Sequence, residues 1–446
     1  MKKPPMCLLL CYYIITFVYC DVGLGNNAQN VIAQENMSVP GVISFESAFG
    51  SEICGTADEF LLVFPRFFGV TKNNAVLIWD ENKIKVFNNE GKGIGFIGRR
   101  GEGPGEFGRG SIIPHLGPND YITVLESSHN IYNAFDADFN LLEKKRIDYE
   151  KDFGEFFSKY PSYEMHNVNK IIMLSESEMI YELELIDNNY TAKQYTDKLS
   201  SYKEHYIVII HKKHNAISEL LFTRRTGYIA YSYKNNNRTR YGIYFTGIFG
   251  SLRWGITSNG KLVNVNTAED THDAQNGSAY TINLVSLDTF KKSTITHKFD
   301  VSEIPEWYIN NINDSASLKV PASGSSRTSY KERLEKAKEL NKLMAQTLRY
   351  QKYYPSISSL MIDRTHVFLF EYDNITKNEE SMDEIPESDE IYVDVFDVDT
   401  EKFIRSVQFP FRPNIIRNGY AYLVSEDNEE FPVIAKYRIS PEVYGK

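Results

Sequence analysis

A hairpin pattern recurs along the chain, and this repetition constrains the fold more than any other feature of the sequence. In residues 75–98, short β-rich runs (AVLIW, IKVF and GIGFIG) alternate with turns that contain Asp, Asn and Gly. The pattern returns in residues 121–147 and, more weakly, in residues 278–300 and 391–410. A hairpin that repeats at intervals of roughly 40–60 residues is typical of the blades of a β-propeller.

A single blade of this kind cannot bury both of its faces. Blades stacked in a closed ring bury them and leave only short sheet edges. We therefore expect an all-β fold, a β-propeller. Two β-sandwiches are an alternative, because their strands also recur at short intervals. The aromatic content of 13%, mostly Tyr and Phe, favours strands.

The N-terminus has the pattern of an export signal. Lys2 and Lys3 precede an apolar run at residues 8–19, which has the length of a signal-peptide core and is shorter than the roughly 20 residues of a membrane-spanning helix. Cys20 ends this run, at the place where a bacterial lipoprotein signal is cleaved and acylated, although Tyr19 fits such a signal poorly.

Ordinary cleavage near Gly25 or Ala33 and an uncleaved anchor are the alternatives to lipidation. We divide the chain into a signal segment (residues 1–20), a polar tether (21–40) and a propeller domain (41–446). This division predicts an exported protein, periplasmic or membrane-anchored at the cell envelope, that meets a membrane only through its N-terminal anchor.

Charge and cysteine content exclude several classes of protein. The formal net charge is −10, which argues against nucleic-acid binding, because that needs Lys and Arg to displace counterions from phosphates. The cysteines are Cys7, Cys11, Cys20 and Cys54. The body of the chain therefore has neither a disulfide framework nor a cysteine-based zinc site, and we expect no cofactor.

One amphipathic helix interrupts the β pattern. Residues 330–352 place Leu334, Ala337, Leu340, Met344 and Leu348 on one face, with charged residues over the rest. Pro355 follows and ends the helix. We interpret it as an insertion between blades that packs on one face of the ring. The acidic run at residues 377–390 lies between two β-rich runs and predicts a solvated hairpin loop.

A glycine-rich turn follows the first hairpin. Residues 95–107, GFIGRRGEGPGEF, combine glycines, which permit positive φ, with Pro104, which restrains Gly103. A phosphate-binding loop would open a helix. No helical pattern follows this turn, so it does not predict phosphate binding.

This turn carries a resemblance to a known group. Residues 98–107 resemble the G-R-x-G-x-G-P-G-E-[FY] turn of bacterial six-bladed propellers related to the NHL-repeat and TolB-like proteins. The late helix, Tyr354-Pro355 and the final hairpin at residues 419–439 are similar to features of that group. The resemblance implies a six-bladed β-propeller of the cell envelope, and most such proteins have no assigned activity. Seven blades remain an alternative, because residues 155–250 depart most from the pattern.

Arginine and tryptophan side chains are the candidate ligand-binding residues. Arg99, Arg100 and Arg109 surround the glycine-rich turn, and Arg253 and Trp254 begin another β segment. If these loops face the mouth of the pore, they suit an anionic or sugar ligand. Salt bridges and packing between blades are the alternative role for them.

No catalytic or metal-binding constellation is complete in the sequence. His205, His211 and His214 lie in one β-rich run. A single strand cannot offer all three to one metal ion, because His214 faces the side opposite to the other two. We therefore interpret them as surface or turn histidines, and we predict no catalytic and no metal-binding residue. A nucleophile elbow is also absent.

These observations predict a non-enzymatic, monomeric propeller that binds a protein, peptide or glycan ligand on one face of the ring, or that serves as a scaffold. The alternative is a propeller enzyme, such as a metal-assisted lactonase or a polysaccharide lyase. A cluster of Glu, Asp, Asn and His at the mouth of the pore would favour the enzyme.

Overall fold

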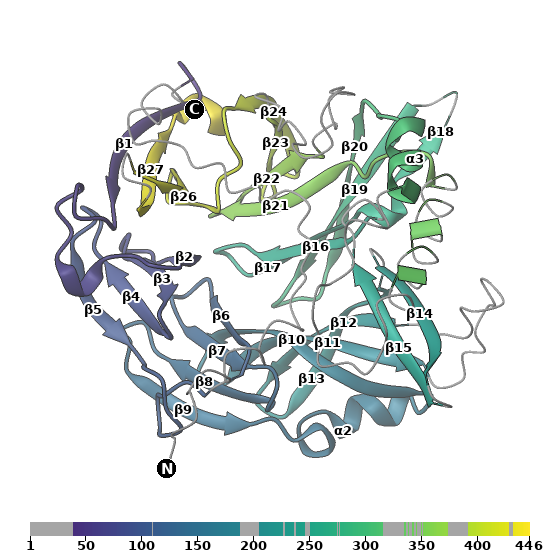
Figure 1. Ribbon diagram of the computed structural model, residues 1–446, viewed down its shortest axis with the longest axis horizontal. Coiled ribbons are helices and arrows are strands. Elements are labelled where there is room, and N and C mark those ends of the chain that lie inside the picture. The colour runs from purple at the N-terminus through teal and green to yellow at the C-terminus, as the bar shows by residue number, and fades with distance from the viewer. Residues whose placement is uncertain are drawn as a thin grey trace, which may run out of the picture.

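The computed structural model shows six antiparallel sheets arranged around a central axis (Figure 1). It describes residues 39–187 except 109, residues 205–314 with short gaps (226–227, 236–237, 246–249, 274 and 276), single residues between 334 and 351, residues 352–372, and residues 391–446 except 428–430. The expected fold is confirmed: the chain is an all-β, six-bladed propeller. Two packed sandwiches and a seventh blade are not present in the described part.

The first three blades follow one another along the chain. Blade 1 contains β2 (Arg66–Val70), β3 (Val76–Asp80), β4 (Lys83–Phe87) and β5 (Gly93–Ile97). Blade 2 contains β6 (Ile112–Leu116), β7 (Ile122–Glu126), β8 (Ile131–Phe135) and β9 (Leu141–Arg146). Blade 3 contains β10 (Tyr163–Ser175), β11 (Glu178–Asp187), β12 (His205–Lys213) and β13 (Ala216–Arg224).

The remaining three blades complete the ring. Blade 4 contains β16 (Leu252–Ile256), β17 (Lys261–Asn266), β19 (Gly277–Ser286) and β20 (Lys292–Phe299), with the short β18 (Thr271–Asp273) also paired to β19. Blade 5 contains β21 (Ile357–Asp363), β22 (His366–Glu371), β23 (Ile391–Asp397) and β24 (Lys402–Phe409). Blade 6 contains β25 (Ile415–Arg417), β26 (Tyr420–Glu426), β27 (Pro432–Ile439) and β1 (Ile43–Phe49).

The middle of the chain forms one blade and one extra hairpin. After blade 3, β14 (Tyr228–Asn235) pairs only with β15 (Arg238–Phe245) among the described strands. The hairpin explains why this region departs from the repeat. It adds two strands between blades 3 and 4 without adding a blade.

The tight turns within the blades follow from local sequence. In blade 1, Glu81 and Asn82 connect β3 to β4 with φ values of 51° and 64°. Two successive residues with positive φ form the type of two-residue turn whose twist matches antiparallel strands, and Asn tolerates this conformation well. This turn fixes the register in which Asp80 lies opposite Lys83.

The two ends of the chain close the ring. The strand β1 pairs antiparallel with β27, so blade 6 combines the start and the end of the domain. Glu46 reinforces this pairing through Lys436 at 2.7 Å and Arg438 at 2.9 Å. Closure covers the sheet edge that β27 would otherwise expose.

Apolar clusters fill the spaces between the blades. One cluster lies at each of the six interfaces between neighbouring blades. Between blades 1 and 2, for example, Leu77 and Val86 pack with Ile122 and Val124. Because both faces of a blade are covered, β3 and β7 are buried at every position, and most of their residues are apolar.

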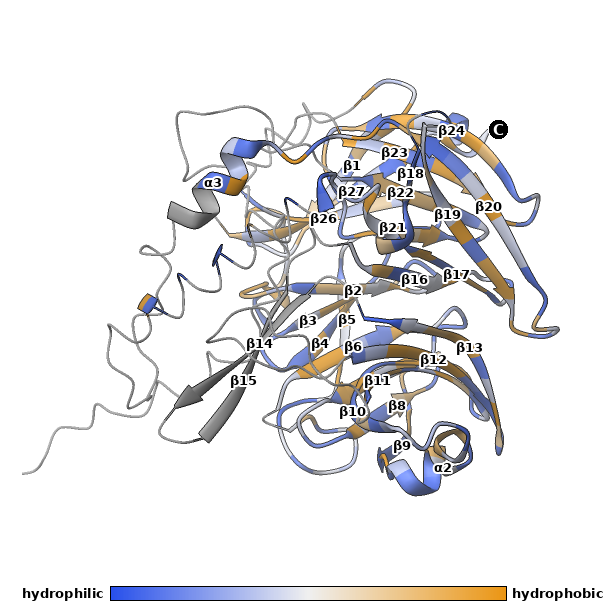
Figure 2. Cartoon of the chain, turned by 90° about the vertical axis from the view of Figure 1, so that its right-hand side faces the viewer, coloured by the Kyte–Doolittle hydropathy of each residue, from blue (hydrophilic) through white to orange (hydrophobic). Residues whose placement is uncertain are grey.

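The helices α2 (Tyr149–Lys159) and α3 (Glu306–Asp314) lie outside the six blades. Figures 1 and 2 show α2 at the outer rim beside blade 3, while α3 stands off one face of the ring. Asp148 caps α2 by accepting a hydrogen bond from the Lys151 amide. Neither helix was expected from the sequence. Short 3₁₀ turns occur at Asp58–Phe60, Thr267–Glu269 and Pro441–Tyr444.

The predicted helix at residues 330–352 lies partly outside the described residues. Those described between 334 and 351 are helical. Among them, the buried Ala345 packs with Ile304, Ile309 and Tyr354. This segment lies between blades 4 and 5, as expected. The acidic run at residues 377–390 lies outside the description, although its flanking strands β22 and β23 do pair.

Two further features of the N-terminal region bear on the sequence predictions. Residues 1–38, with Cys20, lie outside the part of the chain that is described. Cys54 is a free, half-buried thiol. No described helix is long and apolar enough to cross a membrane.

Candidate functional site: the central pore

The six innermost strands enclose a cavity of about 260 Å³ on the axis of the ring. Each blade contributes its first strand to the wall: β2, β6, β10, β16, β21 and β25. The wall consists of Phe68, Val70, His115, Leu116, Gly117, Pro118, Lys170, Ile172, Trp254, Gly255, Ile256, Leu360, Met361, Ile362, Asn414, Ile415 and Arg417. Among the described residues, no Asp or Glu side chain belongs to it.

Glycines allow the inner strands to approach closely. A Cβ atom at Gly69 would lie 2.7 Å from Leu116 Cδ2, and one at Gly255 would lie 2.7 Å from Ile362 Cδ1. Such contacts are too short for ordinary packing. The absence of these side chains lets β2 pack against β6 and β16 against β21, so the pore stays narrow.

Lys170 and Trp254 meet across the gap between blades 3 and 4. Lys170 Nζ lies 4.1 Å from the centroid of the Trp254 ring, which is the geometry of a cation–π contact. Burial lowers the pKa of Lys170, and the carboxylate of Glu182 opposes this shift. Lys170 is half-buried, with its Nζ over the indole ring.

The Glu182 carboxylate binds the indole nitrogen of Trp254 from outside the cavity. Its Oε2 accepts a hydrogen bond from Trp254 Nε1 at 2.5 Å, and its Oε1 accepts one from Asn169 Nδ2 at 3.1 Å. Both oxygens are thus engaged. This network fixes the ring of Trp254, and the carboxylate does not line the cavity.

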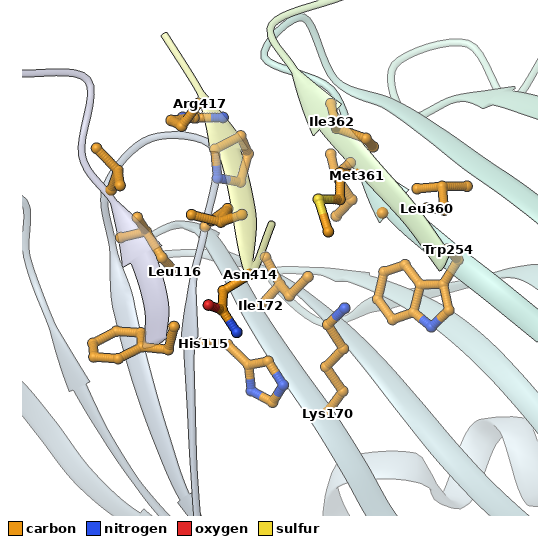
Figure 3. A pocket seen from close by; sticks show the side chains of 17 residues that line it. His115, Leu116, Lys170, Ile172, Trp254, Leu360, Met361, Ile362, Asn414 and Arg417 are labelled. Atoms are coloured by element: carbon orange, nitrogen blue, oxygen red, sulfur yellow. The ribbon is translucent and has the colours of Figure 1, made fainter. Parts of the chain in front are cut away.

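His115 and Asn414 lie at the same end of the cavity as Lys170 (Figure 3). Burial and the charge of Lys170 hold the pKa of His115 well below its ordinary value, so the imidazole is neutral at neutral pH. Its Nδ1 is buried and has no hydrogen-bond partner among the described residues. The Asn414 carbonyl accepts from the Val424 amide at 2.6 Å, and its amide nitrogen points toward His115.

Arg417 lies at the other end of the labelled group (Figure 3). Its Nε is buried and without a hydrogen-bond partner in the described structure. The charge of Arg417 lowers the pKa of the nearby Asp120 carboxyl, but burial has the larger effect and raises that pKa. Both Asp120 oxygens accept hydrogen bonds from the Lys72 amide. Leu116, Ile172 and Met361 lie between the two polar ends.

The arrangement suits an anion with an apolar part. Lys170, Arg417, His115 and Asn414 offer nitrogen donors, and no lining carboxylate competes for them. Hydrogen bonds from charged donors to an anion are among the stronger ones in proteins. A volume of 260 Å³ is below that of most sites for drug-sized ligands, so the pore accommodates a small acid or the acidic end of a larger ligand.

The residues predicted to bind ligand are not brought together. Trp254 lines the pore, and Arg253 is next to it on β16. Arg99 and Arg100 are exposed outside the pore wall, and Arg99 Nε donates to Glu106 Oε1 at 2.7 Å. Arg109 lies outside the described residues.

The glycine-rich turn connects the outer strand of blade 1 to the inner strand of blade 2. Gly98 adopts φ +66°, and a Cβ there would lie 2.2 Å from the Phe107 ring. Phe107 is fully buried and packs on Trp79 and Phe135. Lys144 donates to backbone carbonyls of the turn, including that of Glu106 at 3.0 Å. Its internal contacts are those of a blade connector.

The interpretation of the histidine run as surface or turn residues was wrong for two of the three. His205 and His211 are each only 3% exposed. His205 pairs with Glu184, and His211 Nε2 contacts Glu178 Oε1 at 2.7 Å. Only His214 lies exposed at a turn, with φ 51°. Cross-strand carboxylates stabilise the other two inside the blade.

Sequence reasoning missed Lys170, His115 and Arg417. Each of the three lies in the first strand of its blade, and the ring arrangement of the blades brings these first strands to the central axis. The signal that could have found them is an alignment of the first strand of every blade, which would have shown where polar residues replace apolar ones.

Comparisons with known proteins add little beyond the fold. No family model and no curated protein matches the chain. Among solved structures, a Bacteroides fragilis protein described as exported is 14% identical (TM-score 0.41), with 89% of this chain and 94% of that one covered. A Staphylococcus aureus virginiamycin B lyase with quinupristin is 8% identical (TM-score 0.33), with 84% and 94% covered.

A third similar structure is the extracellular domain of a one-component system from Bacteroides thetaiotaomicron, which is 10% identical (TM-score 0.23), with 84% of this chain and 44% of that one covered. Similarity at this level carries no argument about activity. The relation to NHL-repeat and TolB-like propellers therefore stays a prediction.

Proposed function

We propose that this protein is an exported, non-enzymatic propeller that binds the acidic group of a peptide or glycan in its central pore. The observation that carries the proposal is a pore wall with Lys170, His115, Arg417 and Asn414 and, within the described part of the chain, no carboxylate. A ligand approaching along the axis would place its anionic end near Lys170 and its apolar part against the Leu, Ile and Met side chains.

The same wall favours binding over metal-assisted catalysis. A lactonase-like or lyase-like metal site would need several oxygen and imidazole ligands at one place. The pore offers one histidine and one asparagine, and its lysine and arginine repel a cation.

Matched pairs of small probes test the proposal. Isothermal titration calorimetry would compare glucuronic acid with glucose, and the peptide Ala-Ala-Ala with its C-terminal amide. We expect the acidic member of at least one pair to bind and its neutral counterpart to bind much more weakly. The two pairs separate a glycan acid from a peptide carboxylate.

The variant Lys170→Met tests the site itself. A hydrogen bond to a charged group contributes about 1.5–3 kcal/mol, so affinity for the acid should fall roughly 10- to 100-fold. The control Lys298→Met removes an exposed lysine on β20, away from the pore, and should leave affinity unchanged. Equal binding of acidic and neutral probes, or equal losses in the two variants, would contradict the proposal.

We also propose that residues 1–20 direct export and that Cys20 is acylated. The positive start, the apolar run at residues 8–19 and the polar residues 21–40 support this. Mass spectrometry of the mature N-terminus would show a diacylated or triacylated Cys20. An unmodified N-terminus beyond residue 20 would exclude lipidation and leave export by ordinary cleavage.

A further inference from the structure

Three neighbouring strands of blade 3 bring two histidines and a glutamate together, away from the pore wall. His166 lies on β10, Glu184 on β11 and His205 on β12. In the sheet register, His205 lies opposite Ile186, two positions from Glu184, so both side chains lie on the same face of the sheet.

A bulge brings the third residue to this group. The pairing of β10 with β11 shifts between Met165 and Asn167, which leaves His166 as the extra residue. Bulges commonly redirect a side chain in this way. The His166 and His205 rings consequently meet edge to face, with centroids 4.9 Å apart.

The potential ligand atoms of these three side chains all lie within 4.8 Å of one another. Glu184 and His205 are each 3% exposed, whereas His166 is exposed. The cluster thus has a buried base and an open side toward solvent. We propose that it is a site for a transition-metal ion, with Zn²⁺ as the expected occupant.

The donor set determines this choice of metal. Two imidazoles and one carboxylate are a common ligand set for Zn²⁺ and leave a fourth position for water or an external ligand. Imidazole donors disfavour Ca²⁺ and Mg²⁺, which prefer oxygen. In the metal-free arrangement His205 Nδ1 hydrogen-bonds Glu184 Oε1. Zn²⁺ would take the place of the shared proton, which is released to solvent.

Arg225 binds the second oxygen of the same carboxylate. Its guanidinium pairs with Glu184 Oε2, whereas Oε1 contacts His205. An outer partner that orients a ligating carboxylate is common in metal sites. The carboxylate of Glu164 is also near enough to influence His166, and it adds negative charge that offsets the incoming cation.

Metal uptake by the full chain tests the proposal. The protein would be stripped with a chelator, incubated with ZnCl₂, desalted and analysed for zinc by mass spectrometry. We expect one tightly held Zn²⁺ per chain in the wild type and its loss in His166→Ala. The control His214→Asn changes an exposed turn histidine of the same blade and should retain the metal.

Two further measurements make the outcome decisive. Co²⁺ in place of Zn²⁺ should give the visible absorption of a tetrahedral site in the wild type only. Added Zn²⁺ should raise the unfolding temperature of the wild type, because a ligand of the native state stabilises it, and should not affect His166→Ala. Substoichiometric zinc in the wild type, or equal uptake by His166→Ala, would overturn the proposal.

Discussion

The carboxyl group of Glu371 provides the sharpest test of the electrostatics of this fold. Glu371 ends β22, and burial together with the charges of Asp394 and Asp300 raises its pKa from the ordinary 4.5 to about 7. Asp394 accepts hydrogen bonds from Tyr280 at 2.7 Å and from Ser406. The negative charge of Asp394 disfavours ionisation of Glu371.

The sign of the pH effect follows from the raised pKa. The unfolded chain ionises Glu371 near 4.5, whereas the folded chain keeps it protonated until pH approaches 7. Its contribution to stability is therefore full below pH 4.5 and is lost as pH rises through 7. One pKa unit corresponds to about 1.4 kcal/mol, which sets an upper bound of about 3.4 kcal/mol. Partial exposure reduces this to about 1–2 kcal/mol.

The substitution Glu371→Gln removes the ionisation and keeps the shape. We expect it to raise the free energy of unfolding relative to wild type by about 1–2 kcal/mol more at pH 8 than at pH 5. Urea titrations at the two pH values measure this difference. The exposed Glu52 provides the control Glu52→Gln, which should show little pH-dependent difference. The reasoning would be refuted if the stability of Glu371→Gln relative to wild type, measured as the free energy of unfolding, stayed constant or fell from pH 5 to pH 8.

Three further predictions concern the blades. Lys85→Met should destabilise the protein by about 3–5 kcal/mol in urea unfolding, because it leaves the buried Asp80, 2.8 Å away, without its cation; adding Asp80→Asn should recover part of the loss, and a fully additive cost would contradict this. Phe107→Ala should lower the free energy of unfolding by about 3–5 kcal/mol. Gly98→Ala should destabilise the Phe107→Ala variant less than it destabilises the wild type, because the added Cβ meets the Phe107 ring. Equal losses of stability in the two backgrounds would disprove that contact. Removing β1 (Ile43–Phe49) should expose the edge of β27 and cause aggregation detectable by size-exclusion chromatography; a soluble monomer of unchanged stability would show that the closure is dispensable.

Local sequence was sufficient to predict the strands and turns of several blades. The runs in residues 75–98 became β3, β4 and β5, and the hairpin at residues 419–439 became β26 and β27. These predictions succeeded because two-residue turns and short β-rich runs depend on near neighbours in the chain. Arg253 and Trp254 were also correctly placed at the start of a β segment, which is β16.

Sequence reasoning was less successful where contacts join distant parts of the chain. The pore combines Lys170, Trp254 and Arg417 from different blades, and Trp254 alone among them was a predicted site residue. The cluster of His166, Glu184 and His205 depends on strand register and on a bulge. The sequence analysis considered only the strand that contains His205, and neither His166 nor Glu184 lies on that strand.

The sequence by itself determined a chain of repeated hairpins, a glycine-rich connector and an acidic, cysteine-poor composition. Those features are local or compositional, and they predicted a propeller. Only the tertiary structure decided between six blades and seven, placed the strand β1 in the last blade, and brought Lys170 and Arg417 to the pore wall, where the described residues include no carboxylate. The physical reason is that ring closure depends on packing between all neighbouring blades, and only a closed ring defines which side chains face its axis.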